Sequence, residues 1–221
     1  LLPEPAPTPE TTGAPDAEPT TEPTPTSSAN DELPADVSDL SADDVATMPP
    51  DLISDLSPDQ LRDLPPAAVQ GFTSEQVANL STDAVAAFKP QQVQQLSPEA
   101  VAGLSRTQVS ELTPNAVKGF TSEQMEELPR STFKALETVQ LAKLSKDAVT
   151  GLTSGQLKTL TGEEIAAFKP GKIKLLDADA ISGLKPSTLD DFSRPQARAM
   201  TNEQLAGLSS KQIKRAVDFV D

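Results

Sequence analysis

From Leu40 to Arg215 the sequence repeats an eight-residue unit 22 times without an insertion or a deletion. We number the positions of this octad from one to eight, starting at Leu40. Position one is large and apolar in all 22 octads, and position six in 21 of them, with Ala197 as the exception. A degenerate unit near Glu32 precedes them, with Val37 at position six. Such a chain folds as an array of small equal units that bury their apolar residues against neighbouring units.

The middle of each octad carries the signals of a helix start. Position two is Ser, Thr or Asp in 15 of 22 octads, and Pro is frequent at position three. A Ser or Thr N-cap accepts a hydrogen bond from a free backbone N–H, and Pro at the first helical position loses no hydrogen bond. Position five is often Gln or Glu, which completes a capping box, and positions one and six form a hydrophobic staple. Each octad is therefore predicted to be a helix of five or six residues followed by a corner.

Two other structures are excluded by the same pattern. A continuous helix cannot hold a proline in its interior so often, because each one costs about 3 kcal/mol. A strand needs apolar residues at even spacing, whereas these alternate by five and three residues.

A second period of sixteen residues lies above the octad. Position five is Gln in alternate octads, namely Gln60, Gln76, Gln92, Gln108, Gln124, Gln140 and Gln156, and is mostly Ala in the octads between them. Position eight alternates in the same way between Gly or Ala and a polar residue. We call the octads that start at Leu40, Leu56 and so on odd, and the others even. Even octads are predicted to end in a tight corner, and odd octads in an exposed one.

These observations predict an all-α protein, a thin right-handed-type solenoid with eight residues per helix unit and sixteen per coil. Eleven such coils would form a rod on the order of 100 Å long at the usual helix packing distance. The last segment, 208–221, departs from the period at Ala216 and is predicted to be a longer helix that caps the solenoid 40–215.

The segment 1–39 differs from the repeats. It holds nine acidic residues and no basic one, and it is rich in Pro, Thr, Ser, Glu and Ala. It cannot bury enough apolar surface to offset the cost of ordering the chain, so we expect a disordered stalk or linker. Thr beside Pro is typical of O-glycosylated stalks in secreted proteins, and a removed signal peptide would explain a start at Leu1.

The charge distribution and composition limit the partners that we expect. The chain has a net charge of −15, concentrated in residues 1–61, which carry 14 acids and no base. Residues 130–221 carry 14 bases and 11 acids. We expect no nucleic acid partner and no membrane span. This asymmetry solvates a rod, or it allows the molecules to associate end to end.

The residue types indicate a protein without catalysis. With no His and no Cys, the chain lacks the commonest general base, the commonest zinc ligand and any thiol. We expect no enzyme activity, no metal and no cofactor. The seven glutamines are either a ligand-facing row or capping-box partners. Lys169, Lys172 and Lys174 are either an anion-binding group or solvated surface, and Asn79 begins an N-glycosylation sequon.

The octads 64–80 and 112–128, with their shared Gly-Phe-Thr-Ser-Glu-Gln core, resemble the octad arrays of secreted microbial repeat proteins. The resemblance covers residues 40–215 and implies an extracellular location but no activity. Three functions are expected in order of preference. The first is a structural or adhesive module that serves as a spacer or binds a protein or a cell-wall polymer. The others are an effector-like interaction scaffold and a subunit of an end-to-end filament.

Overall fold

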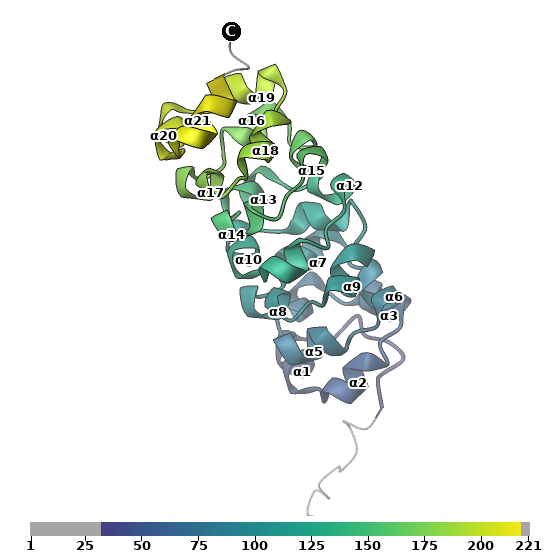
Figure 1. Cartoon of the computed structure of the whole chain (residues 1–221). Coiled ribbons are helices and arrows are strands. Elements are labelled where there is room, and N and C mark those ends of the chain that lie inside the picture. The colour runs from purple at the N-terminus through teal and green to yellow at the C-terminus, as the bar shows by residue number, and fades with distance from the viewer. Residues whose placement is uncertain (1–31, 218–221) are drawn as a thin grey trace, which may run out of the picture.

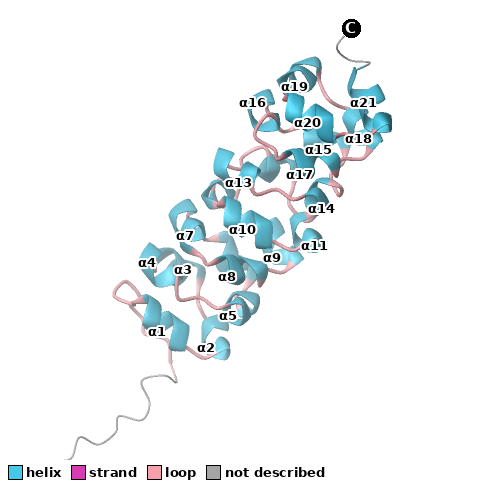
Figure 2. Cartoon of the chain, turned by 90° about the vertical axis from the view of Figure 1, so that its left-hand side faces the viewer, coloured by secondary structure: helices cyan, strands magenta, loops and turns pink. Residues whose placement is uncertain are grey.

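A computed structural model describes residues 32–217, and the side chains as far as Arg215. Those residues form an elongated stack of short helices with no strand among them, and the first and last octads lie at opposite ends of the rod (Figure 1, Figure 2). The all-helical prediction is confirmed. Apart from the single 3-10 turn η1, each helix begins eight residues after the preceding one, or sixteen where η1 intervenes.

The helices are α1 Ala42–Thr47, α2 Pro50–Ser54, α3 Pro58–Asp63, α4 Pro66–Val69, α5 Ser74–Asn79, α6 Thr82–Ala86, α7 Pro90–Gln95, α8 Pro98–Ala102, α9 Arg106–Glu111, η1 Ala116–Gly119, α10 Ser122–Glu127, α11 Arg130–Phe133, α12 Thr138–Leu141, α13 Lys146–Thr150, α14 Ser154–Leu157, α15 Gly162–Ala166, α16 Pro170–Ile173, α17 Ala178–Ser182, α18 Pro186–Asp190, α19 Arg194–Ala199, α20 Asn202–Gly207 and α21 Ser210–Val217.

The predicted caps set the helix starts. In α3, the hydroxyl of Ser57 accepts from the backbone N–H of Gln60, and the side chain of Gln60 accepts from the backbone N–H of Ser57. Pro58 occupies the first turn of that helix. The same reciprocal pair recurs at Thr73 with Gln76. Side-chain chemistry within the octad therefore fixes where the helix begins, as the sequence predicts.

The coil is larger than the sixteen residues predicted. The extensively packed pairs of helices each join one octad to the octad three units further on, as in α2 with α5 and α3 with α6. Side-chain hydrogen bonds reach 28 and 31 residues back, to the octads three and four units earlier. One turn of the superhelix thus holds between three and four octads, near 28 residues, and each octad lies across the junction of two octads in the previous turn.

The corner conformation explains why the sixteen-residue coil is wrong. Leu80 and Ser81, at positions one and two, are both extended, with ψ of 140° and 152°. Two extended residues between short helices redirect the chain at each corner without folding one helix back onto the next. Consecutive helices in the described part of the chain are accordingly not packed extensively on one another. Their partners come from the adjacent turns.

One continuous apolar core runs through the rod, from Val37 to Leu208. Position six supplies its centre, because every residue there from Val45 to Leu189 is at most 1% exposed. The expected disordered segment 1–39 overlaps the described residues at 32–39, and there Val37 is buried and Leu33 packs against the core. The core therefore includes the degenerate unit before Leu40. Residues 1–31 and 218–221 of the predicted stalk and cap lie outside the described residues.

Candidate functional site

The most regular polar feature of the rod is the row of glutamines at position five. Gln76, Gln92, Gln108, Gln124, Gln140 and Gln156 are at most 2% exposed. The side-chain oxygen of Gln108 accepts from the backbone N–H of Ser105 at 2.8 Å, which completes the capping box of α9. Its amide nitrogen donates to the carbonyls of Val77 and Leu80, both at 2.8 Å. One side chain therefore caps the start of its own helix and the end of a helix in the previous turn.

The same bonds recur along the rod. Each of the six amides donates to two carbonyls, 31 and 28 residues earlier, at 2.6 to 2.9 Å. We call this set the glutamine ladder. These carbonyls lie at helix C-termini, where the backbone offers few donors. Those of Val45, Val77, Val93 and Val109 also accept from the N–H of the C-cap residue. The alternative prediction, a ligand-facing row, is wrong for these six residues, because a buried and fully bonded amide cannot meet a ligand. Gln60 is half-buried, and its amide donates to the carbonyl of Pro34 at 3.2 Å.

Other side chains occupy ladder positions without having been predicted to do so. The hydroxyls of Thr132 and Thr188 donate to the carbonyls of Leu104 and Leu160, each 28 residues earlier. Further on, Gln196, Gln204 and Gln212 restore the amide. These residues all occupy position five of the octad, which the sequence shows. The carbonyls to which they donate could not be identified from the sequence, because that requires the number of octads per turn.

The three lysines are not equivalent. Lys169 and Lys174 are exposed, whereas Lys172 occupies a ladder position and its ammonium donates to the carbonyl of Ala142 at 2.9 Å. Burial, with the nearby charges of Lys169 and Lys143, lowers the pKa of Lys172 below its ordinary value. Lys172 is thus a substitute for a ladder glutamine at the end of α12. Asn79 is exposed at the end of α5, and its amide donates to the carbonyl of Glu75 at 2.8 Å.

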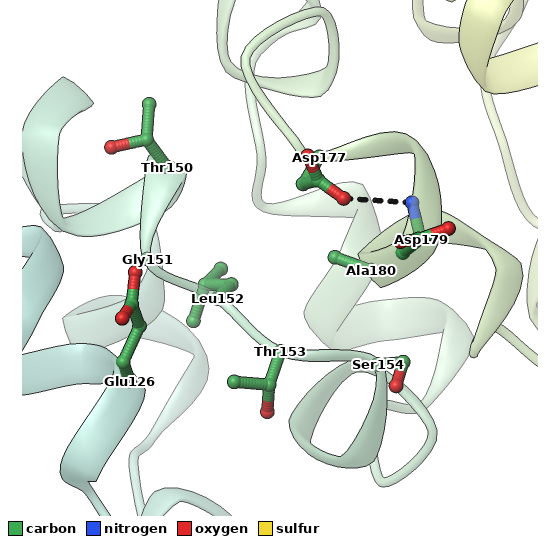
Figure 3. A pocket seen from close by; sticks show the side chains of 9 residues that line it. All are labelled: Glu126, Thr150, Gly151, Leu152, Thr153, Ser154, Asp177, Asp179 and Ala180. Carbon is green, nitrogen blue, oxygen red and sulfur yellow. Dashed lines mark hydrogen bonds between the residues drawn. The ribbon is translucent and has the colours of Figure 1, made fainter.

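A hollow of about 390 Å³ lies between α10, α13, α14 and α17. Glu126 and Thr150 stand on one side of it, and Asp177 and Asp179 stand on the other, with the hydroxyls of Thr153 and Ser154 between them (Figure 3). The carboxylate of Asp177 accepts from the backbone N–H of Asp179 at 2.8 Å and caps α17. The sequence did not indicate this acidic hollow, because its walls come from octads three and four units apart.

Within residues 32–217 no group of three or more acidic residues is arranged to hold a metal ion. None of the described helices combines the length and the apolarity that crossing a bilayer requires. No model of a known protein family matches the chain, and no curated protein matches it either.

Proposed function

We propose that this chain is a non-enzymatic structural module, a stiff extracellular spacer that holds whatever flanks it at a fixed separation. The observation that carries the proposal is the unbroken connection between turns. One apolar core runs from Val37 to Leu208, and the glutamine ladder ties successive turns together by buried hydrogen bonds. An array bonded in this way resists bending, because bending would break buried bonds on one side of the rod.

The coil size gives the proposed spacer a definite length. At near 28 residues per turn, the 22 octads make about six turns rather than eleven, and at about 10 Å between packed helices the rod spans roughly 60 Å. This replaces the longer rod expected from the sequence.

A distance measurement between the ends tests stiffness. The chain has no cysteine, so Asp51→Cys and Glu203→Cys, both at exposed positions, would place one spin label near each end. We expect a single narrow distribution of distances between the two labels. Removing a 16-residue pair of octads between them should shift this distribution to a shorter distance and leave it narrow. A broad distribution in the undenatured protein would overturn the spacer proposal.

The extracellular part of the proposal is supported by the Pro- and Thr-rich composition of residues 1–39 and by the octad resemblance. Fractionation of the native source, followed by mass analysis of the chain, tests it. Recovery from the medium or the cell wall with glycans on the Thr-rich segment is expected. Recovery of the unmodified chain from the cytosol would contradict it.

A second candidate function is an interaction scaffold, and the acidic hollow at Glu126, Asp177 and Asp179 is the observation that favours it. A ligand there would be a cationic segment of a protein. Titration with a labelled oligolysine peptide tests it, comparing the wild type with the Glu126→Gln, Asp179→Asn double variant. Glu99→Gln, at an exposed position outside the hollow, is the control. Equal affinity for all three proteins would remove this candidate.

A further inference from the structure

Each interior contact between turns joins residues at position one of one turn to residues at position six of another. The N-terminal end of the rod exposes the first set, and the C-terminal end exposes the second. Inside the rod, residues at positions one and six are buried. At the N-terminal end, Leu40 and Met48 at position one are only partly buried, although Val45 at position six is fully covered. At the C-terminal end the pattern is reversed: Ile213 at position six is 38% exposed and Leu205 is partly buried, while Leu208 at position one is 5% exposed. Position one therefore packs toward the previous turn, and position six toward the next.

The N-terminal end is hollowed where a previous turn would lie. Leu40, Met48 and Leu52 line a cavity of about 260 Å³ together with Thr47 and Pro34. Leu52 occupies position five, where later octads place the side chains that face the previous turn. The exposed position-six residues at the other end of the rod are of the size and character that this hollow would bury, because the same types of side chain meet at every interior turn.

The charges of the two ends are complementary. Residues 32–59, one turn at the N-terminal end, hold eight acidic residues and no basic one. Residues 188–215, the last turn whose side chains are described, hold five basic and three acidic residues, and Asp218 and Asp221 follow them in the sequence. Glu32 and Asp44 border the N-terminal hollow, and Lys211 and Lys214 are exposed beside Ile213.

Asp44 stands at the first ladder position and accepts from the backbone N–H of Ser41 at 2.9 Å. A carboxylate cannot donate to helix carbonyls as a ladder glutamine does. Contact at this end therefore depends on attraction between Asp44 and a cation, and it does not extend the glutamine ladder. Such a contact is weaker than an interior turn and is screened by salt.

We propose that the rods associate head to tail, the C-terminal end of one molecule docking on the N-terminal end of a second copy. Leu205 and Ile213 enter the hollow of Leu40, Met48 and Leu52, and Lys211 and Lys214 face the carboxylates around it. Because the two surfaces differ, the contact is heterologous and leaves a free docking surface at each end of the growing assembly. This goes beyond the spacer function, since a monomeric rod would still be a spacer.

Two charge substitutions at exposed or partly exposed positions test the proposal on the full chain. Leu52→Lys places a cation against the basic C-terminal end, and Ile213→Glu places a carboxylate against the acidic N-terminal end. Sedimentation velocity at low salt, from micromolar to millimolar protein, should show wild-type assemblies that lengthen with concentration and dissociate on adding salt. Each variant alone should lose this lengthening. An equimolar mixture of the two should regain it, because unaltered ends then meet and the introduced charges attract one another.

The pattern of these results separates the alternatives. Val139→Glu, at a position that is 55% exposed in the middle of the rod, is the control and should assemble as the wild type does. Circular dichroism should show the same helix content for all the proteins. If Leu52→Lys still dimerises alone, the contact is tail to tail and the proposal is wrong. If the wild type stays monomeric at millimolar concentration and low salt, the proposal also fails, while a narrow end-to-end distance in that monomer would leave the spacer function intact.

Discussion

At the scale of single residues, the rod depends on neutral side chains that donate and accept at once. A ladder glutamine accepts from an N-cap N–H and donates to two carbonyls, so one buried group satisfies backbone atoms in two turns. No buried side-chain polar atom in the described part of the chain lacks a hydrogen-bond partner. Since an amide carries no charge, this network is satisfied without the desolvation cost that buried ion pairs incur.

Gln108→Glu separates these two roles within one residue. The carboxylate can still accept from Ser105, but it cannot donate to the carbonyls of Val77 and Leu80. We expect a loss of about 2–4 kcal/mol in unfolding free energy at neutral pH. The carbonyl of Leu80 loses its donor, and that of Val77 keeps only the backbone N–H of Leu80, both beside a negative charge. Burial raises the pKa of such a carboxyl, so stability should recover as the pH falls and the carboxyl becomes a donor. Urea unfolding at several pH values measures this. Gln94→Glu, at an exposed position, is the control.

Lys172→Gln should stabilise the rod. The ammonium of Lys172 reaches one carbonyl at the end of α12, whereas a ladder glutamine reaches two and carries no charge. We expect a gain of about 1 kcal/mol at neutral pH. Because burial lowers the pKa of Lys172 in the folded protein, the unfolded chain binds more protons, and wild-type stability rises as the pH approaches 10.5. The difference between variant and wild type should therefore shrink at alkaline pH. A variant less stable than the wild type at neutral pH would contradict the ladder assignment, and Lys169→Gln is the matched control.

At the scale of elements, the sequence predicts the helices well because their determinants are local. Ser57, Pro58 and Gln60 lie within one octad, and their contacts form within it. The contacts that set the coil are not local. Nothing in the octad of Gln76 indicates whether its amide meets a carbonyl 15 or 31 residues away. The alternation of odd and even octads is therefore compatible with a coil of two octads as well as with the larger coil that the structure shows. The ladder as a capping-box row was predictable, and its second bond and the acidic hollow were not.

The glycines at position eight belong to this scale, and their role is close approach rather than turn conformation. Gly103 and Gly183 end their helices with φ of −72° and −71°, which any residue adopts. A Cβ at Gly119 would lie 2.0 Å from the carbonyl oxygen of Pro90 in the previous turn. Gly119 is therefore required by the distance between turns, which explains the preference for small residues in even octads.

Gly119→Ala should force adjacent turns apart. We expect a loss of about 1–3 kcal/mol, the usual cost of overpacking, despite the higher helix propensity of alanine. Gly171→Ala is the matched control, because a Cβ there meets nothing within 4 Å. It should be neutral or stabilise slightly, since alanine restricts the unfolded chain more than glycine does. Thermal unfolding of both variants measures the difference. Equal melting temperatures would show that position eight is not tightly packed.

At the scale of the whole molecule, the sixteen-residue alternation places the residues that connect one turn to the previous turn. Position five of an odd octad meets the junction of the octads four and three units back, and position eight of an even octad faces the octad three units back. As far as Gln156, alternation therefore determines which carbonyls receive a glutamine and which backbone receives a glycine; beyond it, Gln196, Gln204 and Gln212 stand in consecutive octads. We therefore expect that the number of octads can change, provided that odd and even octads still alternate. Length and pairing are thus encoded separately, as suits a spacer.

Deleting one octad or two tests this rule. Removal of 104–119 keeps the alternation and brings Gln124 to the place of Gln108, which is 31 and 28 residues beyond the carbonyls of Val77 and Leu80. Removal of 104–111 alone puts Ala116 there instead. The carbonyl of Leu80 then has no donor, that of Val77 keeps only the backbone N–H of Leu80, and Glu127 takes the place of a glycine corner. The unsatisfied carbonyl of Leu80 costs about 1–3 kcal/mol, and the overpacked glycine corner costs about as much again. The one-octad deletion should therefore be destabilised by several kcal/mol.

The longer deletion should therefore give the more stable protein, although it removes twice as much core. Loss of two octads shortens the rod but leaves every remaining contact of a kind already present in it. Loss of one octad keeps more apolar surface and misplaces the polar contacts of the three or four octads that span the junction. Guanidinium unfolding, with hydrogen exchange to locate the weakened turns, compares the two. If the one-octad deletion unfolds at the higher denaturant concentration, burial alone holds the turns together. In that case the pairing of glutamine with carbonyl and of glycine with backbone has no part in choosing which octads meet.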